Sequence, residues 1–318
     1  AKRSQSDVIV AGHVCLDIIP RFRDTGAARI DQIMRPGKLV EVGPASISTG
    51  GPVSNTGIGL QKLGCKVCFT ARTGDDALGL MTRELLEHTG SAEGIHMAPG
   101  CHSSYTVAIA PLKIDRIFLH SSGPNNEFSA EDLDAALIAR CRQFHLGYPP
   151  IMRRLYSEDG RQLREVFRIA KEAGATTSCD MALPDPSTES GQAPWARILE
   201  NVLPYIDIFL PSAEEVLYML EPENFNAMKV EHQDADLLDH LTAEDYARLA
   251  DKLLELGTKM TSLKSGHRGF YLRTGDKSRF AEMGAARPGE PDTWSNRELW
   301  CPAFAAPDPA SATGSGGS

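Results

Sequence analysis

Short apolar runs that alternate with amphipathic helical patterns limit the folds open to this chain more than any other feature of its sequence. Parallel strands need a crossover connection, usually a helix, so the alternation predicts an α/β fold with a mostly parallel sheet flanked by helices. The expected strands are residues 7–12, 65–71, 175–180, 206–210, 260–264 and 269–273, and the expected helices are 52–63, 77–88, 131–140, 161–173, 195–203, 212–220 and 242–256.

Two parts of the chain carry strand-like patterns with no helix between them. They lie between about residues 13 and 50 and between 100 and 122, with the clearest patterns at 38–42, 104–110 and 116–120. We expect these strands to form a small β-sheet lid on the α/β body. Ligands of open α/β sheets bind beyond the carboxyl ends of the strands, so chemistry is expected just after each strand.

The charge balance and hydropathy argue against two classes of partner. The formal net charge is -9, whereas binding to a nucleic-acid backbone requires clustered Lys and Arg. No apolar run approaches the roughly 20 residues of a membrane span. The run Val8–Ala11 is too short for a signal peptide. We therefore expect neither a nucleic-acid nor a membrane partner.

The seven cysteines indicate the compartment. Their number is odd, and the spacing of Cys65 and Cys68 has no second pair of ligands that would complete a zinc site. Scattered cysteines of this kind are typical of reduced thiols, which predicts a cytoplasmic protein.

Two motifs near the N-terminus carry groups that suit a hydroxyl-rich ligand. Asp17 follows the first strand and can accept hydrogen bonds from two hydroxyls, although a solvated loop carboxylate is the simpler alternative. Gly50 and Gly51 precede a helix and allow a ligand to approach the backbone closely. Asn55 adds both donors and an acceptor, with a local helix cap as its alternative.

A third motif, Gly74–Gly79, again joins a strand to a helix, and there Asp75 or Asp76 is expected to act as an N-cap. In this order and spacing, the three motifs resemble the N-terminal signature of the PfkB/ribokinase family of sugar and nucleoside kinases. In that signature an acidic residue follows strand one, GG-x-x-x-N opens a helix, and an LG turn precedes G-x-D-x-x-G. The resemblance implies a ribokinase-like domain over residues 1–318.

The resemblance continues through the second half of the chain. Arg116 precedes a turn like one of the family, and Asp180 ends a strand as does an Asp that faces the family's active site. Glu215 matches the Glu of an N-x-x-E motif that organises Mg²⁺, with Ser212 in the place of Asn. The substrate-binding residues that the resemblance implies are Asp17, Gly50, Gly51, Asn55, Arg116 and Asp180.

A glycine turn resembles the family's T-L-G-x-x-G segment beside the nucleotide. Lys264 stands in the place of Thr, and Gly266 and Gly269 complete the turn. Lys264 can pair with a phosphate or point to solvent, and both interpretations stay open. His267 is expected to be a turn residue rather than a catalyst.

The last residues resemble the family's D-T-x-G-A-G-D loop, whose glycines form an anion hole and whose final Asp is the general base. Gly314, Ser315 and Gly316 match the anion hole, but Gly317 occupies the position of the base. The alternative is a Gly/Ser tail that matches by composition alone. We expect the domain to lack the helices that follow this loop in the family, and its activity to be reduced.

The resemblance implies a carbohydrate kinase that uses ATP and Mg²⁺ to phosphorylate a hydroxyl of a small sugar-like substrate, with a possible homodimer through the lid. A catalytically impaired homologue that binds sugar or nucleotide is the second hypothesis, motivated by Gly317. A dinucleotide-dependent oxidoreductase is the third. It would require G-x-G-x-x-G after the first strand, which residues 12–17 do not provide.

Overall fold

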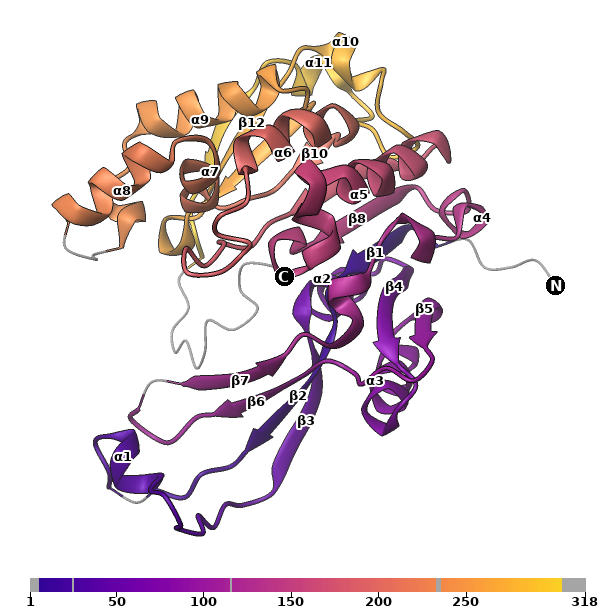
Figure 1. Cartoon of the computed structure of the whole chain (residues 1–318). Helices are drawn as coiled ribbons and strands as arrows, with labels where there is room; N and C mark the ends of the chain where they lie inside the picture. The colour runs from indigo at the N-terminus through magenta and orange to yellow at the C-terminus, as the bar shows by residue number, and fades with distance from the viewer. Residues whose placement is uncertain (1–5, 25, 115, 233–235, 305–318) are drawn as a thin grey trace.

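The structure is a computed structural model that describes residues 6–24, 26–114, 116–232 and 236–304. Within these residues, nine strands form one sheet and four strands form a second, separate sheet. Figure 1 shows the large sheet with its helices as an α/β body from which the smaller sheet, the lid, projects. This confirms the predicted fold class.

Seven neighbouring strands of the large sheet, from β5 at one edge to β11, run parallel to one another. In spatial order β11, β10, β9, β8, β1, β4 and β5 run in parallel, and β12 and β13 continue the sheet beyond β11 in antiparallel pairing. The bounds are β1 (Val8–Gly12), β4 (Val67–Gly74), β5 (Ser91–Ala98), β8 (Gln143–Gly147), β9 (Thr176–Asp180), β10 (Ile208–Phe209), β11 (Met260–Lys264), β12 (Phe270–Thr274) and β13 (Glu298–Cys301).

Helices connect the parallel strands and cover the sheet. The α-helices are α1 (Ile30–Ile33), α2 (Gly51–Lys62), α3 (Ala77–Glu87), α4 (Ala135–Ile138), α5 (Arg153–Glu172), α6 (Trp195–Val202), α7 (Ala213–Leu220), α8 (Pro222–Glu231), α9 (Ala243–Glu255), α10 (Lys277–Phe280) and α11 (Pro291–Trp294). The short 3₁₀ turns are η1 (Gly123–Glu127), η2 (Ala130–Asp132), η3 (Pro149–Ile151), η4 (Leu203–Tyr205), η5 (Leu237–Asp239) and η6 (Gly266–Arg268).

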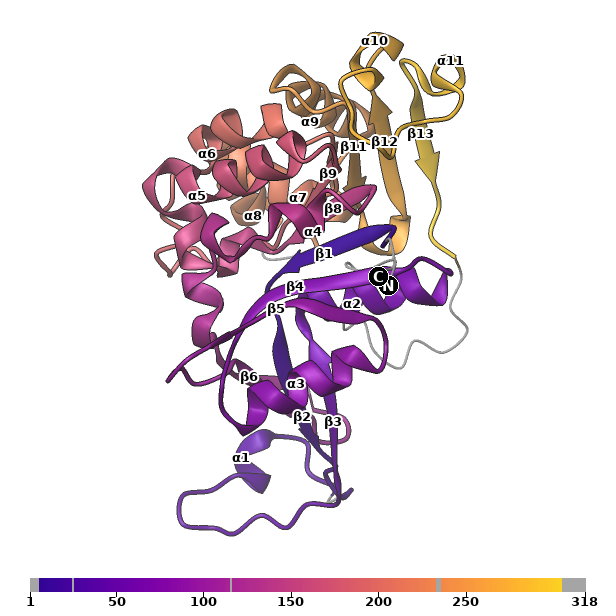
Figure 2. The ribbon, with the colours of Figure 1, turned by 90° about the vertical axis from the view of Figure 1, so that its right-hand side faces the viewer.

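The core has two parts because the strands are buried on both faces. Ile9 and Ala11 of β1 belong to the larger cluster with α5, α6, α7 and α9, whereas Val8 and Val10 pack in a smaller cluster with Val53 of α2. Successive side chains of a strand point to opposite faces of the sheet, so a strand that is buried on both faces needs apolar residues at consecutive positions, as β1 has. Figure 2 shows α5 and α6 on one side of β1 and α2 on the other.

The lid consists of β3 (Ala45–Gly50), β2 (Cys15–Pro20), β6 (Tyr105–Ile109) and β7 (Ile117–Ser121), in that spatial order. It leaves the body directly after β1 and returns to it through α2, which begins where β3 ends. The lid strands therefore extend from the edge of the large sheet at which the parallel strands end.

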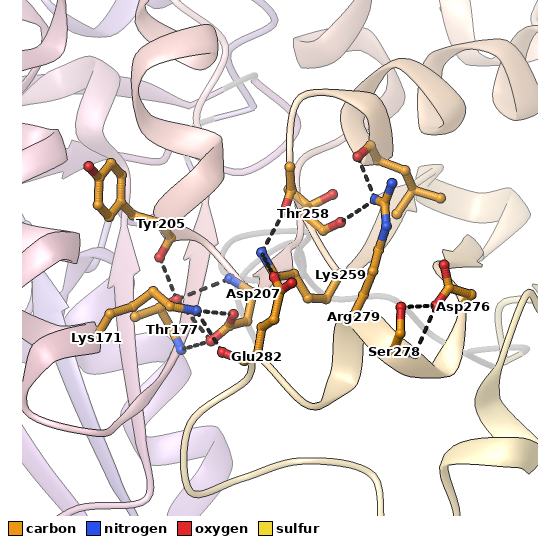
Figure 3. Close-up of polar contacts among 12 residues, drawn as sticks. Lys171, Thr177, Tyr205, Asp207, Thr258, Lys259, Asp276, Ser278, Arg279 and Glu282 are labelled. Atoms are coloured by element: carbon orange, nitrogen blue, oxygen red, sulfur yellow. Dashed lines mark hydrogen bonds and ion pairs between the residues drawn. The ribbon is translucent and has the colours of Figure 1, made fainter.

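The opposite edge of the sheet is fastened by a network of charges and hydroxyls (Figure 3). Asp207, fully buried before β10, accepts hydrogen bonds from the backbone N–H of Thr177 at 3.0 Å and from its hydroxyl at 3.3 Å, and also from Lys171. On the same edge, Lys259 donates to the carbonyl of Gly257 at 2.8 Å. The backbone N–H of Lys259 also donates to the carbonyl of Asp207 at 2.9 Å, so the starts of β9, β10 and β11 are joined to one another and to the end of α5.

Some sequence expectations differ from the structure. Residues 38–42 were expected to form a strand but have no regular structure; the lid strand begins later, at Ala45. The helix expected at 131–140 is divided into η2 and α4, because Ser129 and Asp134 each cap a separate turn. The central strand β8 was not predicted.

All seven cysteines are free thiols, in agreement with the expectation of reduced cysteines. Asp76 caps α3 by accepting from the backbone N–H of Gly79 at 2.9 Å, as predicted for this turn. Among the residues that the structure describes, no helix has the length and apolar character needed to cross a membrane.

Candidate active site

The residues singled out from the sequence gather where the parallel strands end. β1 ends at Gly12, β9 at Asp180 and β11 at Lys264, and the lid starts beside the end of β1. Carboxyl ends of parallel strands share one edge, so the position of the site follows from the parallel topology. Two groups of side chains lie along this edge, one at the lid and one over β9 and β11.

The first group is a polar row that crosses all four strands of the lid. Asp17 pairs in register with Ser48 on one side and with Thr106 on the other, and Thr106 pairs with His120. Residues in register present their side chains to the same face, so these four side chains line one surface. The hydroxyl of Thr106 is hydrogen bonded to Nδ1 of His120 at 3.0 Å. Burial raises the pKa of the half-buried Asp17 carboxyl.

The glycine pair is required by the close approach of two side chains. A Cβ atom on Gly50 would overlap the carboxylate of Asp17. A Cβ atom on Gly51 would lie 2.6 Å from the carbonyl oxygen and 2.8 Å from Nδ1 of His13. Gly51 also has a φ of +84°, a conformation that favours glycine. The two glycines therefore make room for Asp17 and His13 rather than only forming a turn.

The second group centres on an ion pair between Asp180 and Lys264, which come from β9 and β11. Asp180 is buried, and one of its carboxylate oxygens also accepts from the backbone N–H of Met181 at 2.7 Å. Burial raises the pKa of Asp180, and Lys264 opposes this rise. The structure therefore gives Lys264 a partner within the protein, which neither sequence-based interpretation of this residue included.

Glu215 lies beside this pair at the start of α7. Its carboxylate accepts from the backbone N–H of Ser212 at 2.7 Å, while the Ser212 hydroxyl accepts from the backbone N–H of Glu215 at 3.1 Å. This capping box explains why Ser is tolerated where the family motif has Asn. Burial raises the pKa of Glu215; Lys264 lowers it and Asp180 raises it further.

Tyr148 lies between the two groups, at the end of β8. It has left-handed backbone angles, φ 61° and ψ 46°, which cost a non-glycine residue about 1–3 kcal/mol and are found most often at functional sites. Burial, followed by the carboxylates of Asp180 and Glu215, raises the pKa of its phenol to about 12. The side chain is therefore a neutral hydroxyl next to both carboxylates.

The glycine turn after β11 is η6. Gly266 has a φ of +49° and Gly269 a φ of +100°, both in the left-handed region. A Cβ on Gly269 would overlap the carbonyl oxygen of Cys301 at the end of β13. His267 is exposed and lies 3.0 Å from Asp239, consistent with the expected turn residue.

The remaining predicted residues are placed differently. Asn55 lies half-buried in α2, one turn after Gly51. Arg116 immediately precedes β7, four positions before His120 in sequence, with its guanidinium 5.9 Å from the ring of Phe118. A strand rises about 3.4 Å per residue, so the backbone of Arg116 lies four such steps along the strand from His120. The structure therefore does not bring Arg116 to the row of Asp17. Gly314, Ser315, Gly316 and Gly317 lie outside the described residues.

Three residues of this edge were not predicted as site residues: His13, His120 and Tyr148. Tyr148 follows β8, and because that strand was not predicted, its position at a strand end was not recognised either. His13 follows the same strand as Asp17, but nothing local distinguishes it from a loop residue. His120 enters the row only through the pairing of β6 with β7.

A metal ion would find few direct protein ligands here. Among the residues that the structure describes, no three His, Cys, Asp or Glu side chains are grouped so that they could hold a metal. Mg²⁺ keeps several waters and commonly takes only one or two carboxylates plus substrate phosphates. Glu215 and Asp180, the two buried carboxylates near Lys264, fit that mode of binding.

Comparison with known proteins gives a family model and several relatives. Residues 6–287 match the model described as pfkB family carbohydrate kinase. The probable fructokinase-4 of Arabidopsis thaliana is 25% identical over 246 residues, which are 75% of this chain and 70% of that protein. The probable fructokinase-3 of the same plant is 26% identical over 196 residues, 59% of this chain and only 55% of that protein.

Solved structures share the fold. The Arabidopsis thaliana ribokinase complexed with ribose and ATP aligns with a TM-score of 0.66 and 17% identity, covering 99% of this chain and 83% of that one. The fructokinase with bound ATP from Xylella fastidiosa aligns with a TM-score of 0.59 and 17% identity, covering 85% and 75%. At these identities the likeness concerns the fold.

Proposed function

Because the chain belongs to the pfkB family of carbohydrate kinases, we propose that it phosphorylates a hydroxyl of a sugar or sugar-like substrate with ATP. One observation carries the proposal: the polar row of the lid begins beside the end of β1, and the buried carboxylates with Lys264 lie at the ends of β9 and β11, on the same edge of the large sheet. They adjoin β1 and β9, which are two strand spacings, or roughly 10 Å, apart. That separation suits a sugar hydroxyl on one side and a nucleotide on the other.

The lid end of the edge would hold the sugar. Asp17 would accept hydrogen bonds from substrate hydroxyls, and Gly50, which has no side chain, leaves space for its carboxylate. Gly51 and Asn55 would also contact the sugar. Arg116 was expected in this group; it can join only if the lid bends, since it lies at the far end of β7.

The other end of the edge would hold the nucleotide. Lys264 precedes the turn of Gly266 and Gly269, and its ammonium group would bind nucleotide phosphates in place of Asp180 or together with it. Asp180 would then act as a positioning residue for Lys264 more than as a direct sugar ligand. Phosphoryl transfer depends chiefly on such positioning and on charge stabilisation.

Magnesium would neutralise charge on the phosphates during transfer. Glu215 would hold the ion mainly through water, because one of its carboxylate oxygens already accepts from the backbone N–H of Ser212. Mg²⁺ commonly keeps several of its waters and takes few protein ligands directly. The residues 314–316 would supply an anion hole, and Gly317 stands where the family has its base. Without a base the rate falls by roughly 10²–10⁴-fold.

The second candidate function is a homologue that binds sugar or nucleotide without transferring phosphate, favoured by Gly317. A screen of ADP release with Mg·ATP against D-fructose, D-ribose and nucleosides separates the two. Sugar-dependent ADP release supports the kinase. Calorimetric binding of a sugar without ADP release, also after Gly317→Asp, supports the second candidate. Glu255→Gln, an exposed change at the end of α9, serves as the matched control.

A homodimer through the lid is part of the proposal. The lid face opposite the polar row carries Ile18 in register with Ile47 and Val107, and Val107 in register with Leu119. Ile47 and Leu119 are 46% and 52% exposed. Exposed apolar faces of this kind mark interaction sites, and a second copy would offer the same surface. Light scattering should show a dimer that Leu119→Glu dissociates.

A further inference from the structure

His13 is a buried imidazole without a hydrogen-bond partner. It is 3% exposed, and both ring nitrogens are buried without a partner among the described residues. Leaving a buried donor and acceptor unpaired costs free energy, and nearly all such groups in folded proteins are paired. A group that enters from outside the protein and pairs with this ring would recover that cost.

The surroundings of His13 show where such a group would enter. On the body side the ring is fixed, because Gly51 approaches so closely that a Cβ there would lie 2.8 Å from Nδ1. On the other side its neighbour is His120 of the lid, with ring centroids 5.3 Å apart and planes tilted by 42°. His120 is exposed and lies in the polar row with Asp17. The ring of His13 is thus covered by an element of the separate lid sheet.

Neither histidine ring carries a positive charge near neutral pH. Burial, with a smaller contribution from His120, lowers the pKa of His13 to about 3. Burial also lowers the pKa of His120, which the Asp17 carboxylate only partly offsets. Near neutral pH both rings are uncharged, so each has one N–H donor and one nitrogen acceptor, and in His120 the Nδ1 atom is already hydrogen bonded to Thr106. The ionised carboxylate of Asp17 offers acceptors and no donor.

We propose that His13 and His120 form a specificity subsite that binds a hydroxyl of an uncharged polyol and rejects substrates that present a phosphate or carboxylate there. The inference rests on the proposed sugar kinase function and names the chemistry of its substrate. A hydroxyl donates and accepts, as does each neutral ring. An anionic group only accepts, so it can use the N–H donor of a neutral ring but not its nitrogen acceptor, and it is repelled by Asp17.

The first experiment follows the ring itself. The full chain, labelled with ¹⁵N-histidine and assigned with His13→Asn, is titrated with D-fructose, D-ribose and D-fructose 6-phosphate. We expect a neutral sugar to shift both ¹⁵N resonances of His13, and the phosphate ester to leave them unchanged. No response to either neutral sugar, or an equal response to the phosphate ester, overturns the inference. A His13 response without ADP release overturns only the proposed phosphoryl transfer.

The second experiment distinguishes recognition from a packing role. His13→Leu replaces unpaired polar atoms by apolar ones, so we expect the melting temperature of the free protein to stay equal or rise. The stabilisation by the sugar that shifts His13 should be lost. If His13 only fills space, sugar-induced stabilisation survives, and the inference fails. His13→Asn, which keeps a donor and an acceptor, should recover part of the effect.

His120 is exposed, so substitutions there give a third test in which the packing of the core is not disturbed. We expect His120→Leu to raise the sugar Kd about tenfold, because one hydrogen bond to the sugar is lost. The Kd for ATP should not change. His120→Gln should restore most of the affinity. His120→Arg, which adds a fixed cation, should shift the preference toward D-fructose 6-phosphate by tenfold or more. An unchanged preference in His120→Arg contradicts the charge argument.

Discussion

The two edges of the large sheet each carry a buried aspartate paired with a lysine, and they use that pair differently. At the edge where the strands start, Asp207 accepts from Lys171 and from both donors of Thr177 (Figure 3). At the edge where the strands end, Asp180 has Lys264 and one backbone N–H. There a second buried carboxylate, Glu215, lies near the same lysine.

The difference lies in how completely each carboxylate is compensated. Asp207 is fully buried with three donors directed at it, so nothing else is needed for its negative charge. Asp180 and Glu215 share one ammonium group, and burial raises the pKa of both. A buried charge that lacks full compensation is costly, and such groups persist mainly at sites of function. An aspartate–lysine pair therefore stabilises the fold at one edge of the sheet, and at the other edge it has charge left to interact with a ligand.

The largest expected effect is on stability at the closed edge. Asp207→Ala removes the acceptor of the buried backbone N–H of Thr177 and the carboxylate partner of Lys171, so we expect the free energy of unfolding to fall by about 3–5 kcal/mol. Asp180→Asn should lower it less, because the side chain of Lys264 is 26% exposed and water can solvate its charge once the carboxylate is gone. Urea denaturation measures both. Equal losses in the two variants would remove the distinction between the edges.

The reverse ranking is expected for activity. Asp180→Asn should lower kcat/KM for sugar phosphorylation about 10²-fold, since Lys264 loses the partner that positions it. Glu255→Gln, at the other edge, should leave kcat/KM unchanged. Steady-state ADP release is the measurement, and full activity in Asp180→Asn would show that the pair is structural after all.

Two glycines extend the comparison to the lid side. In Gly50→Ala the new methyl would overlap only the mobile end of Asp17, so we expect the sugar KM to rise about tenfold with an unchanged melting temperature. In Gly147→Ala it would overlap the ring of Pro52, which cannot move freely, so stability should fall by about 1–3 kcal/mol. A lower melting temperature in Gly50→Ala would mean that the lid row is part of the core.

The smallest effect is the pH dependence of stability. Because burial raises the pKa of Asp180 above 3.8, the native state holds this proton more tightly than the unfolded chain. Its contribution to stability is present below about pH 3.8 and is lost as the pH rises through the raised pKa. Asp180→Asn should therefore become more stable relative to the wild type between pH 4 and pH 7. Urea titrations that show a constant or decreasing difference would contradict this sign.

Local patterns were sufficient for much of the fold and part of the site. The apolar run of β1 and the helix caps at Asp76 and Ser212 were readable because they depend on neighbours in sequence. The glycine pair and Asp17 were readable because their order matches a family signature. β8 was missed since its run contains Gln143 and His145, which bind Ser178 of β9 and so replace apolar contacts on that face.

By itself the sequence determined that strands and helices alternate, that Asp17 follows β1, and that a glycine pair opens α2. Only the tertiary structure decided that His120 joins Asp17 through the register of β6 and β7, and that Lys264 pairs with Asp180. The reason is physical: which side chains meet across strands depends on strand order and register. These are set by the packing of the whole core and are not written in any one segment.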